Sequence, residues 1–218
     1  MNCSRNEAIM KYSPVTVANL PSSPAPRNIM RRLGAVDLAD SADIENNFRK
    51  DWLSEAMSHC SFKGVWMLLP AEDLPFTGDL VGRMISGCNW AVLMAVTAGE
   101  EISLWIKELF EAGNGAKGAF ADAVASEGVE AALSYMQKMI TISLVRNGIS
   151  VKKARISPGF GDFLLAEQCT MLQMLDCRER LGISVNNAFI MSPEKSATAL
   201  TGAFEIIQTT NTGVLYDS

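Results

Sequence analysis

The sequence contains a single histidine, His59, among its 218 residues. A Ser-His-Asp triad or a Cys-His pair needs a histidine as its base, so this composition argues against a hydrolase of either kind. Cys60 follows His59 directly, but no second cysteine lies at Cys-x-x-Cys distance. Because structural zinc sites gather about four such ligands, we predict no bound metal.

The cysteines are few and widely separated, and their number, five, is odd. A disulfide framework normally has an even number of cysteines at short, regular spacings. We therefore predict free thiols and a reducing, cytoplasmic compartment. The five are Cys3, Cys60, Cys88, Cys169 and Cys177.

An excess of positive charge and a long apolar run are missing as well. The net charge is −5, so nothing favours nucleic acid or an anionic membrane as a partner. A membrane-spanning helix needs about 20 consecutive apolar residues. The best candidate, residues 90–98, has only the length of a strand. We predict neither nucleic acid nor a membrane as a partner.

The chain divides by composition into a lead-in, residues 1–60, and a domain, residues 61–218. The first 26 residues carry four prolines separated by serines, which is typical of an arm without packed structure. Two helices are expected after this arm, over residues 28–33 and 43–58, the first ended by Gly34.

The remaining residues mix strands with helices and predict an α+β fold. Apolar runs indicate strands over 65–69 and 90–97, and weaker patterns indicate strands over 184–191 and beyond 199. Helical spacing of apolar residues predicts helices over 100–112, 117–146 and 162–181. Gly128 is expected to kink or split the second of these.

One short segment, Arg155 to Gly161, combines a cation with a tight turn (sequence RISPGFG). Pro158 has a fixed φ and holds Ser157 extended, and the two glycines tolerate positive φ. The arginine fork suits a carboxylate or a phosphate. This pattern predicts a strand end that presents Arg155 and bare backbone N–H groups to a small anionic molecule. Taken alone, these seven residues are explained better by a strand, a turn and a surface arginine.

The segment also belongs to a wider set of motifs. Arg155 to Asp162, together with Glu167-Gln168 and Leu181-Gly182-Ile183, resembles the activation domain of cobalamin-dependent methionine synthase, and more closely the stand-alone proteins similar to that domain. Met191 to Ser196 and Gly202 extend the resemblance, which covers about residues 80 to 205.

The resemblance implies a curved antiparallel sheet with flanking helices. It also implies that the protein binds S-adenosylmethionine and supports the reductive methylation of cobalamin, with electrons from a donor protein. The corrinoid-binding pattern Asp-x-His-x-x-Gly is missing, since His59 is followed by Cys60, Ser61 and Phe62. The cobalamin is therefore expected on a partner, either a corrinoid protein or a cobalamin-dependent methyltransferase.

The resemblance assigns candidate ligand contacts residue by residue. Arg155 matches the arginine that holds S-adenosylmethionine, and Ser157 and Gly159 match positions where main-chain atoms meet the ligand. Phe160 stands where the methionine synthase domain has a tyrosine, so the ring is kept and the hydroxyl is lost. Glu130 matches a helical glutamate that reaches the ligand. Without the resemblance, Glu130 would be taken for an ordinary solvated glutamate.

Lys195 and Ser196 lie in a turn that the resemblance places near the corrinoid or a partner domain, although a capped turn before a strand explains them equally well. An aspartate from the N-terminal part of the family domain, and a downstream tyrosine, have no match here. Three functions stay open: an S-adenosylmethionine-binding accessory protein, a docking module that has lost the ligand, and a regulator that senses S-adenosylmethionine.

Overall fold

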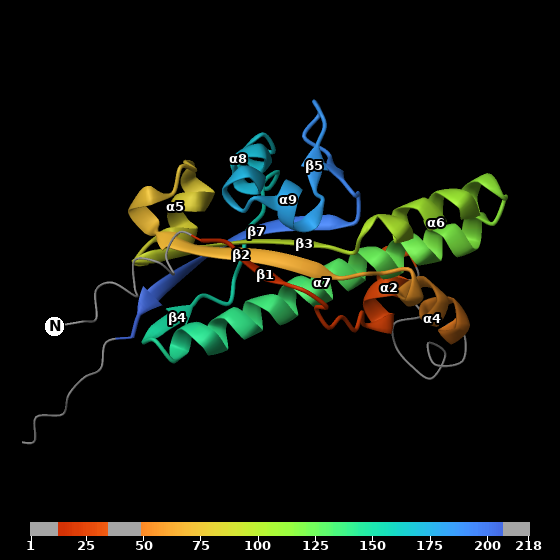
Figure 1. The fold of residues 1–218 in the computed structure, drawn as a ribbon, viewed down its shortest axis with the longest axis horizontal. Coiled ribbons are helices and arrows are strands. Elements are labelled where there is room, and N and C mark those ends of the chain that lie inside the picture. Colours follow the sequence, from red (N-terminus) through yellow and green to blue (C-terminus); the bar gives the residue numbers. More distant parts are fainter. Residues whose placement is uncertain (1–12, 35–48, 207–218) are drawn as a thin grey trace, which may run out of the picture.

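The computed structural model describes residues 13–34 and 49–206. Five strands form one sheet in the order β1-β2-β3-β7-β4, and every neighbouring pair is antiparallel. This arrangement confirms the predicted α+β class with its antiparallel sheet and flanking helices (Figure 1). The strands are β1 (Val15–Val17), β2 (Lys63–Pro70), β3 (Trp90–Thr97), β4 (Ile149–Val151) and β7 (Ser196–Glu205).

Helices cover both faces of the sheet (Figure 1). One face carries α2 (Pro26–Arg32), α4 (Lys50–Ser58), α6 (Glu100–Glu111) and α7 (Gly115–Val145). The opposite face carries α5 (Asp79–Ile85), α8 (Glu167–Met174) and α9 (Cys177–Leu181). A short 3₁₀ helix, η2 (Ala71–Asp73), follows β2, and a small hairpin is formed by β5 (Ser184–Val185) and β6 (Met191–Ser192).

Strand β3 is an inner strand of the sheet, and its side chains pack into the hydrophobic cores on both faces. Successive side chains of a strand point to opposite faces. Val92, Met94 and Val96 therefore pack towards α7, while Leu93 and Ala95 pack towards α8 and α9. The prediction of a strand over 90–97, buried on both faces, is confirmed.

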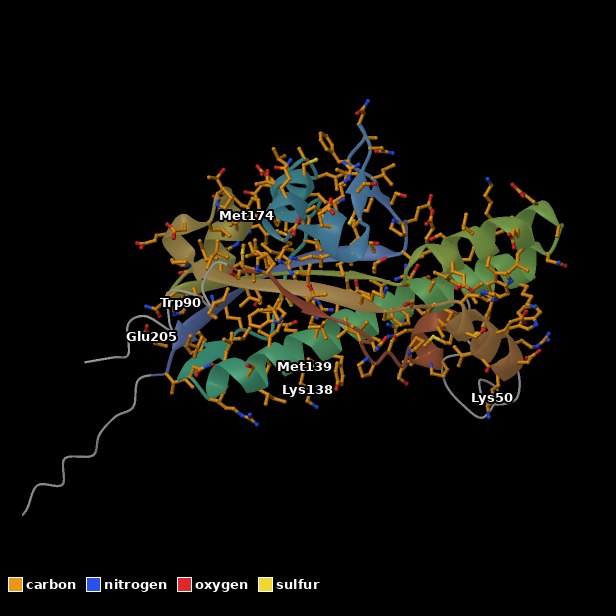
Figure 2. The ribbon with its side chains drawn as sticks, viewed as in Figure 1. Lys50, Trp90, Lys138, Met139, Met174 and Glu205 are labelled. Atoms are coloured by element: carbon orange, nitrogen blue, oxygen red, sulfur yellow. The ribbon has the colours of Figure 1, made fainter. Side chains whose placement is uncertain are left out.

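Helix α7 is the longest element and supplies much of one core. The helix runs unbroken through Gly128, so it is not split there, and the predicted kink stays a prediction. Gly128 is buried, and a Cβ there would lie 2.5 Å from the Phe62 ring, so this glycine allows close packing. Lys138 and Met139 lie on the side of α7 that faces away from the sheet (Figure 2).

Two further predictions need correction. The helix expected over 162–181 begins at Glu167 and breaks at Asp176, which adopts a left-handed conformation with φ of 52°. The residues before Glu167 are not helical, and one of them, Phe163, is buried in the core between the sheet and α8. The strand expected over 184–191 is two short strands that pair with each other.

The part of the lead-in that the structure describes is packed rather than loose. Strand β1 pairs with β2, and Leu20 and Ile29 belong to the core beside α7. The predicted helix over 28–33 is confirmed as α2. The helix expected over 43–58 is observed as α4 from Lys50, and residues 43–48 lie outside the described residues. The division of the chain at residue 60 stays a prediction. Within 13–34 and 49–206, no helix is long and apolar enough to cross a bilayer.

Candidate functional site

Arg155 lies in a bulge that follows β4 at the edge of the sheet. Strand β4 pairs with β7 up to Val151, opposite Ala203, and pairing returns only at Ile156, opposite Leu200. Four residues, 152–155, therefore stand opposite two, 201 and 202. A bulge of this kind bends the chain and redirects a side chain. Here it carries Arg155 towards α7.

The Arg155 guanidinium contacts three side chains of α7. Its Nη2 donates to Glu130 Oε2 at 2.9 Å and to Ser134 Oγ at 3.1 Å. Its Nη1 donates to Gln137 Oε1 at 3.0 Å. The side chain of Arg155 is 24% exposed and that of Glu130 is 52% exposed. The structure thus brings two predicted ligand residues, Arg155 and Glu130, into one ion pair.

The turn that follows is closed by its own hydrogen bonds. Ser157 Oγ donates to the carbonyl of Thr198 in β7 at 2.6 Å. The N–H of Gly159 donates to the Phe163 carbonyl at 2.7 Å, and that of Phe160 to the Ser157 carbonyl at 3.3 Å. These two N–H groups are therefore not bare, which corrects the prediction from the sequence. Gly159 does adopt a positive φ, 95°, as predicted.

Asp162 anchors the far end of the turn to α5. Its carboxylate accepts hydrogen bonds from the backbone N–H of Leu80, at 3.0 Å, and from that of Asp79. These bonds stabilise the charged form and lower the pKa of Asp162. Negative charge is also favourable at a helix N-terminus. A Cβ at Gly78 would lie 2.9 Å from the carboxylate, so a glycine leaves room for it.

Several large apolar side chains are exposed on the turn, on the segment that follows it and on the loop between β5 and β6. Phe160 is 66% exposed, and a Cβ added at Gly159 would lie 3.4 Å from the Leu165 side chain. Gln168 of α8 donates to the Phe189 carbonyl at 2.8 Å, which ties the loop between β5 and β6 to the same side. We call these side chains the apolar rim: Phe160, Leu164, Leu165, Phe189 and Ile190.

Lys195 and Ser196 make contacts inside the chain. Lys195 is 13% exposed, and its ammonium pairs with Asp122 and donates to Ser126 Oγ at 3.1 Å, both on α7. Ser196 Oγ donates to the Pro193 carbonyl at 2.8 Å. These contacts match the structural interpretation of the turn, and the partner-facing role stays a prediction.

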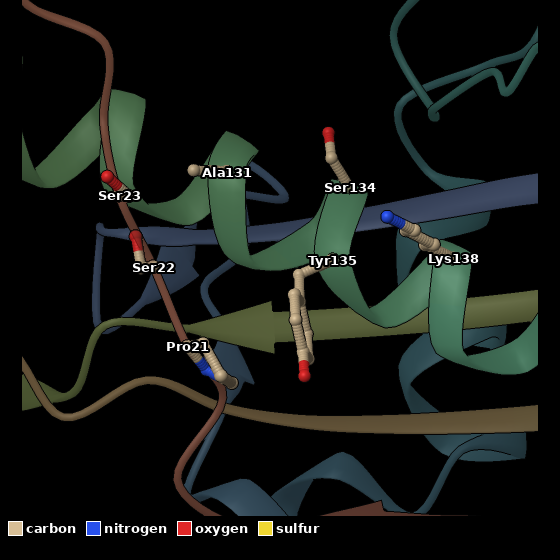
Figure 3. Close-up of a pocket in the computed structure, with 7 residues that line it drawn as sticks. All are labelled: Pro21, Ser22, Ser23, Ala131, Ser134, Tyr135 and Lys138. Carbon is tan, nitrogen blue, oxygen red and sulfur yellow. The ribbon is translucent and has the colours of Figure 1, made fainter.

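A groove of about 370 Å³ lies along the outer side of α7, beside the Arg155 cluster. Its other wall is the chain between β1 and α2, residues 21–23, which Ser22 fixes by donating to the Gly128 carbonyl at 2.8 Å. Figure 3 shows Ser134 and Lys138 on one turn and the next of α7, with Tyr135 between them. Ser134 is shared between the groove and the Arg155 cluster.

No group of three or more potential metal ligands occurs in the part of the chain that the structure describes. Burial raises the pKa of the Cys60 and Cys177 thiols to about 12, so neither forms a nucleophilic thiolate near neutral pH. The chemistry of this site therefore rests on the charged pair, the turn and the apolar rim.

Sequence reasoning missed Gln137 and Ser134. Gln137 could have been found, because it follows Glu130 by two helical turns and lies next to Met136, within a stripe of apolar residues. A polar residue at such a position requires hydrogen-bond partners. Ser134 carries no comparable signal.

The fold and the site together define a small α+β domain in which an arginine and an exposed turn lie at the edge of an antiparallel sheet. No protein-family model matches the sequence, and no curated protein matches it. Among solved structures, the chain is similar to the MetH reactivation domain bound to AdoHcy, with a TM-score of 0.63 and 16% sequence identity. The match covers 89% of this chain and 79% of that one. The chain therefore has the fold of a methionine synthase reactivation domain, as its motifs predicted.

Proposed function

We propose that this protein binds S-adenosylmethionine at Arg155 and the turn up to Phe160, and supports the reductive methylation of cobalamin held by a partner. The observation that carries the proposal is the Arg155–Glu130 pair beside an exposed, apolar turn. It stands on a fold whose solved neighbour is described as bound to AdoHcy.

The pair matches the two charges of an amino acid. Arg155 would hold the α-carboxylate, and Glu130 would hold the α-ammonium or a ribose hydroxyl. An ion pair that is partly exposed contributes about 0–1 kcal/mol, so a zwitterionic ligand can replace it at small cost. The sulfonium and adenine would then lie over Phe160, whose ring offers a face to a cation.

The protein would act by positioning, because the methyl group is already activated by the sulfonium. Holding two reactants in the correct relative position can lower a reaction barrier by about 7–11 kcal/mol. The partner's cobalamin, once reduced by a donor protein, supplies the nucleophile. The residues of this chain would fix the carboxylate and ammonium ends of the ligand, and the apolar rim would exclude water from its methyl group.

Calorimetric titration of the purified protein with S-adenosylmethionine tests the proposal. We expect binding, a loss of at least tenfold in affinity for Arg155→Ala, and no change for Arg146→Ala, which removes an equal charge at the exposed end of α7. Absence of binding at millimolar ligand, with and without a cobalamin protein, would contradict it.

A second function, a docking module that no longer needs the ligand, is favoured by one observation. Arg155 and Glu130 satisfy each other without any ligand, while the apolar rim leaves large side chains exposed. Exposed apolar groups of this kind often mark protein interaction sites. A stable complex with a corrinoid protein that is insensitive to Arg155→Ala but lost in Phe160→Asp would favour this function over the first.

A further inference from the structure

The bulge that presents Arg155 is tied to β7 at its two ends, where the N–H groups of Lys152 and Ile156 donate to the Gly202 and Leu200 carbonyls at 2.9 Å. Residues 152–155 lie outside the regular pairing of β4 with β7, because four residues stand opposite two. Backbone carbonyls that are withdrawn from water need hydrogen-bond partners, and an unpaired one costs about 1–3 kcal/mol when it is fully buried. The partners of this segment therefore decide where Arg155 lies.

Two buried side chains provide these partners. Gln137 Nε2 donates to the carbonyls of Lys152, at 2.9 Å, and Lys153, at 3.2 Å. Thr201 Oγ1 lies 2.7 Å from the Ala154 carbonyl, to which it donates. Gln137 is 7% exposed and Thr201 is fully buried. Three consecutive carbonyls are thus supported, those of Lys152 and Lys153 by Gln137 and that of Ala154 by Thr201, whose Oγ1 also lies 3.2 Å from the Lys152 carbonyl.

Gln137 contacts the bulge and the arginine at once. Its amide group donates through Nε2 to the bulge and accepts through Oε1 from Arg155 Nη1 at 3.0 Å. A primary amide carries donors on one atom and an acceptor on the other, so it can serve both sides. A glutamate would place an oxygen against the two carbonyls, and a methionine would offer neither group.

We propose that Gln137 is a positioning residue that sets the guanidinium of Arg155 for its ligand. Arg155 Nη1 donates to Gln137 on the buried side, while Nη2 donates to Glu130 on the exposed side. A carboxylate ligand that replaces the contacts of Nη2 with Glu130 and Ser134 consequently meets the Nε–Nη2 edge, in a side-on bidentate contact. The inference rests on the proposed function for the nature of the ligand, but the orientation of Arg155 can be measured without any ligand.

The first measurement is the arginine side-chain ¹H–¹⁵N NMR spectrum of the free protein, with the Arg155 signal identified by its loss in Arg155→Lys. We expect Gln137→Met to shift or broaden this signal. The matched control is Gln168→Met, which removes the other glutamine that is buried among residues 13–34 and 49–206, a donor to the Phe189 carbonyl on the opposite face. An Arg155 signal that is unchanged in Gln137→Met overturns the proposal, as does an equal change in Gln168→Met.

The second measurement is the affinity for S-adenosylmethionine and AdoHcy. We expect Gln137→Met to weaken binding about tenfold, and to weaken it no further when Arg155 is already lysine. Additive losses in the double variant would show that Gln137 does not act through Arg155. If the wild-type protein binds neither ligand, the proposed function fails, whereas the NMR result still decides the positioning role.

Gln137→Glu covers the case in which Gln137→Met does not fold. It keeps an acceptor for Arg155 Nη1 and replaces the donor that faces the bulge. We expect a folded protein whose Arg155 signal is displaced and whose affinity is reduced. An Arg155 signal and an affinity equal to those of the wild type would overturn the proposal.

Discussion

At the scale of single residues, the turn from Ser157 to Asp162 is held at both ends by side-chain contacts. Ser157 ties it to β7, and Asp162 ties it to the N-terminus of α5. The ring between these anchors, that of Phe160, is left largely exposed. A rigid turn that exposes an aromatic ring is suited to contact with a ligand or partner.

The cap at α5 gives a prediction for Asp162→Ala. We expect this variant to unfold at a temperature a few degrees lower than the wild type at pH 7, because two backbone N–H groups lose their acceptor. The folded pKa of Asp162 is lowered from the ordinary 3.8, so the stabilisation is full above about pH 4 and disappears as the pH falls through the folded value. Thermal unfolding of both proteins between pH 7 and pH 2.5 measures this.

Asp162→Asn is the control for that pH dependence. Its amide oxygen still accepts a hydrogen bond but does not titrate, so its difference from Asp162→Ala should not vary with pH. A gap between wild type and Asp162→Ala that persists unchanged at pH 2.5 would contradict the role of the carboxylate.

Phe160 gives a second prediction at this scale. Because this residue is 66% exposed, Phe160→Ala should change the free energy of unfolding by no more than about 0.5 kcal/mol. The same change should weaken S-adenosylmethionine binding about tenfold through the lost ring contact. Chemical denaturation and calorimetry measure the two quantities. Leu104→Ala, which removes an exposed side chain of α6, should alter neither, and an equal loss of affinity in that variant would argue against a specific role for Phe160.

At the scale of elements, close packing depends on small residues where α5 meets β7. A Cβ at Gly202 would lie 2.7 Å from the Met84 carbonyl and 2.5 Å from the Cys88 sulfur. Because a backbone carbonyl cannot move aside cheaply, α5 would have to shift. The approach of α5 matters to the site, since α5 also holds Asp162.

Gly202→Ala is therefore expected to destabilise the protein by about 1–3 kcal/mol, measured by urea unfolding. Gly82→Ala is the matched control within α5, because Gly82 is exposed and a Cβ there meets nothing within 4 Å. It should stabilise the protein by about 0.5–1 kcal/mol through helix propensity. Equal effects of the two substitutions would contradict the packing argument.

At the scale of the whole molecule, the described lead-in and the sheet share one core. Ile29 of α2 is fully buried against the α7 side of the sheet, and Leu20 packs in the same core. The chain between them forms one wall of the groove beside Arg155. The lead-in consequently contributes to both the stability and the surroundings of the candidate site.

Ile29→Ala should cost about 2–5 kcal/mol in the free energy of unfolding, because it leaves a cavity in a core that cannot fully close. Val15→Ala, an exposed position of β1, is the control and should cost less than about 1 kcal/mol. Circular dichroism during urea unfolding gives both values. A small effect of Ile29→Ala would instead show that the lead-in is dispensable, as the predicted division at residue 60 implies.

The sequence by itself determined the elements whose patterns are long or repeated. The apolar run at 90–97 requires a buried strand, and helical spacing over about 30 residues predicts α7. The motif around Arg155 also carried the resemblance that the fold now supports. These conclusions depend on local periodicity and residue chemistry, which the sequence displays directly.

Only the tertiary structure decided how the site is assembled. The contact of Asp162 with α5, the packing of β1 on β2, and the pairing of Arg155 with Glu130 all involve residues distant in sequence. Gln137 shows the reason most clearly. Its role depends on a two-residue mismatch between β4 and β7, and strand register is set by contacts across the sheet rather than by local sequence.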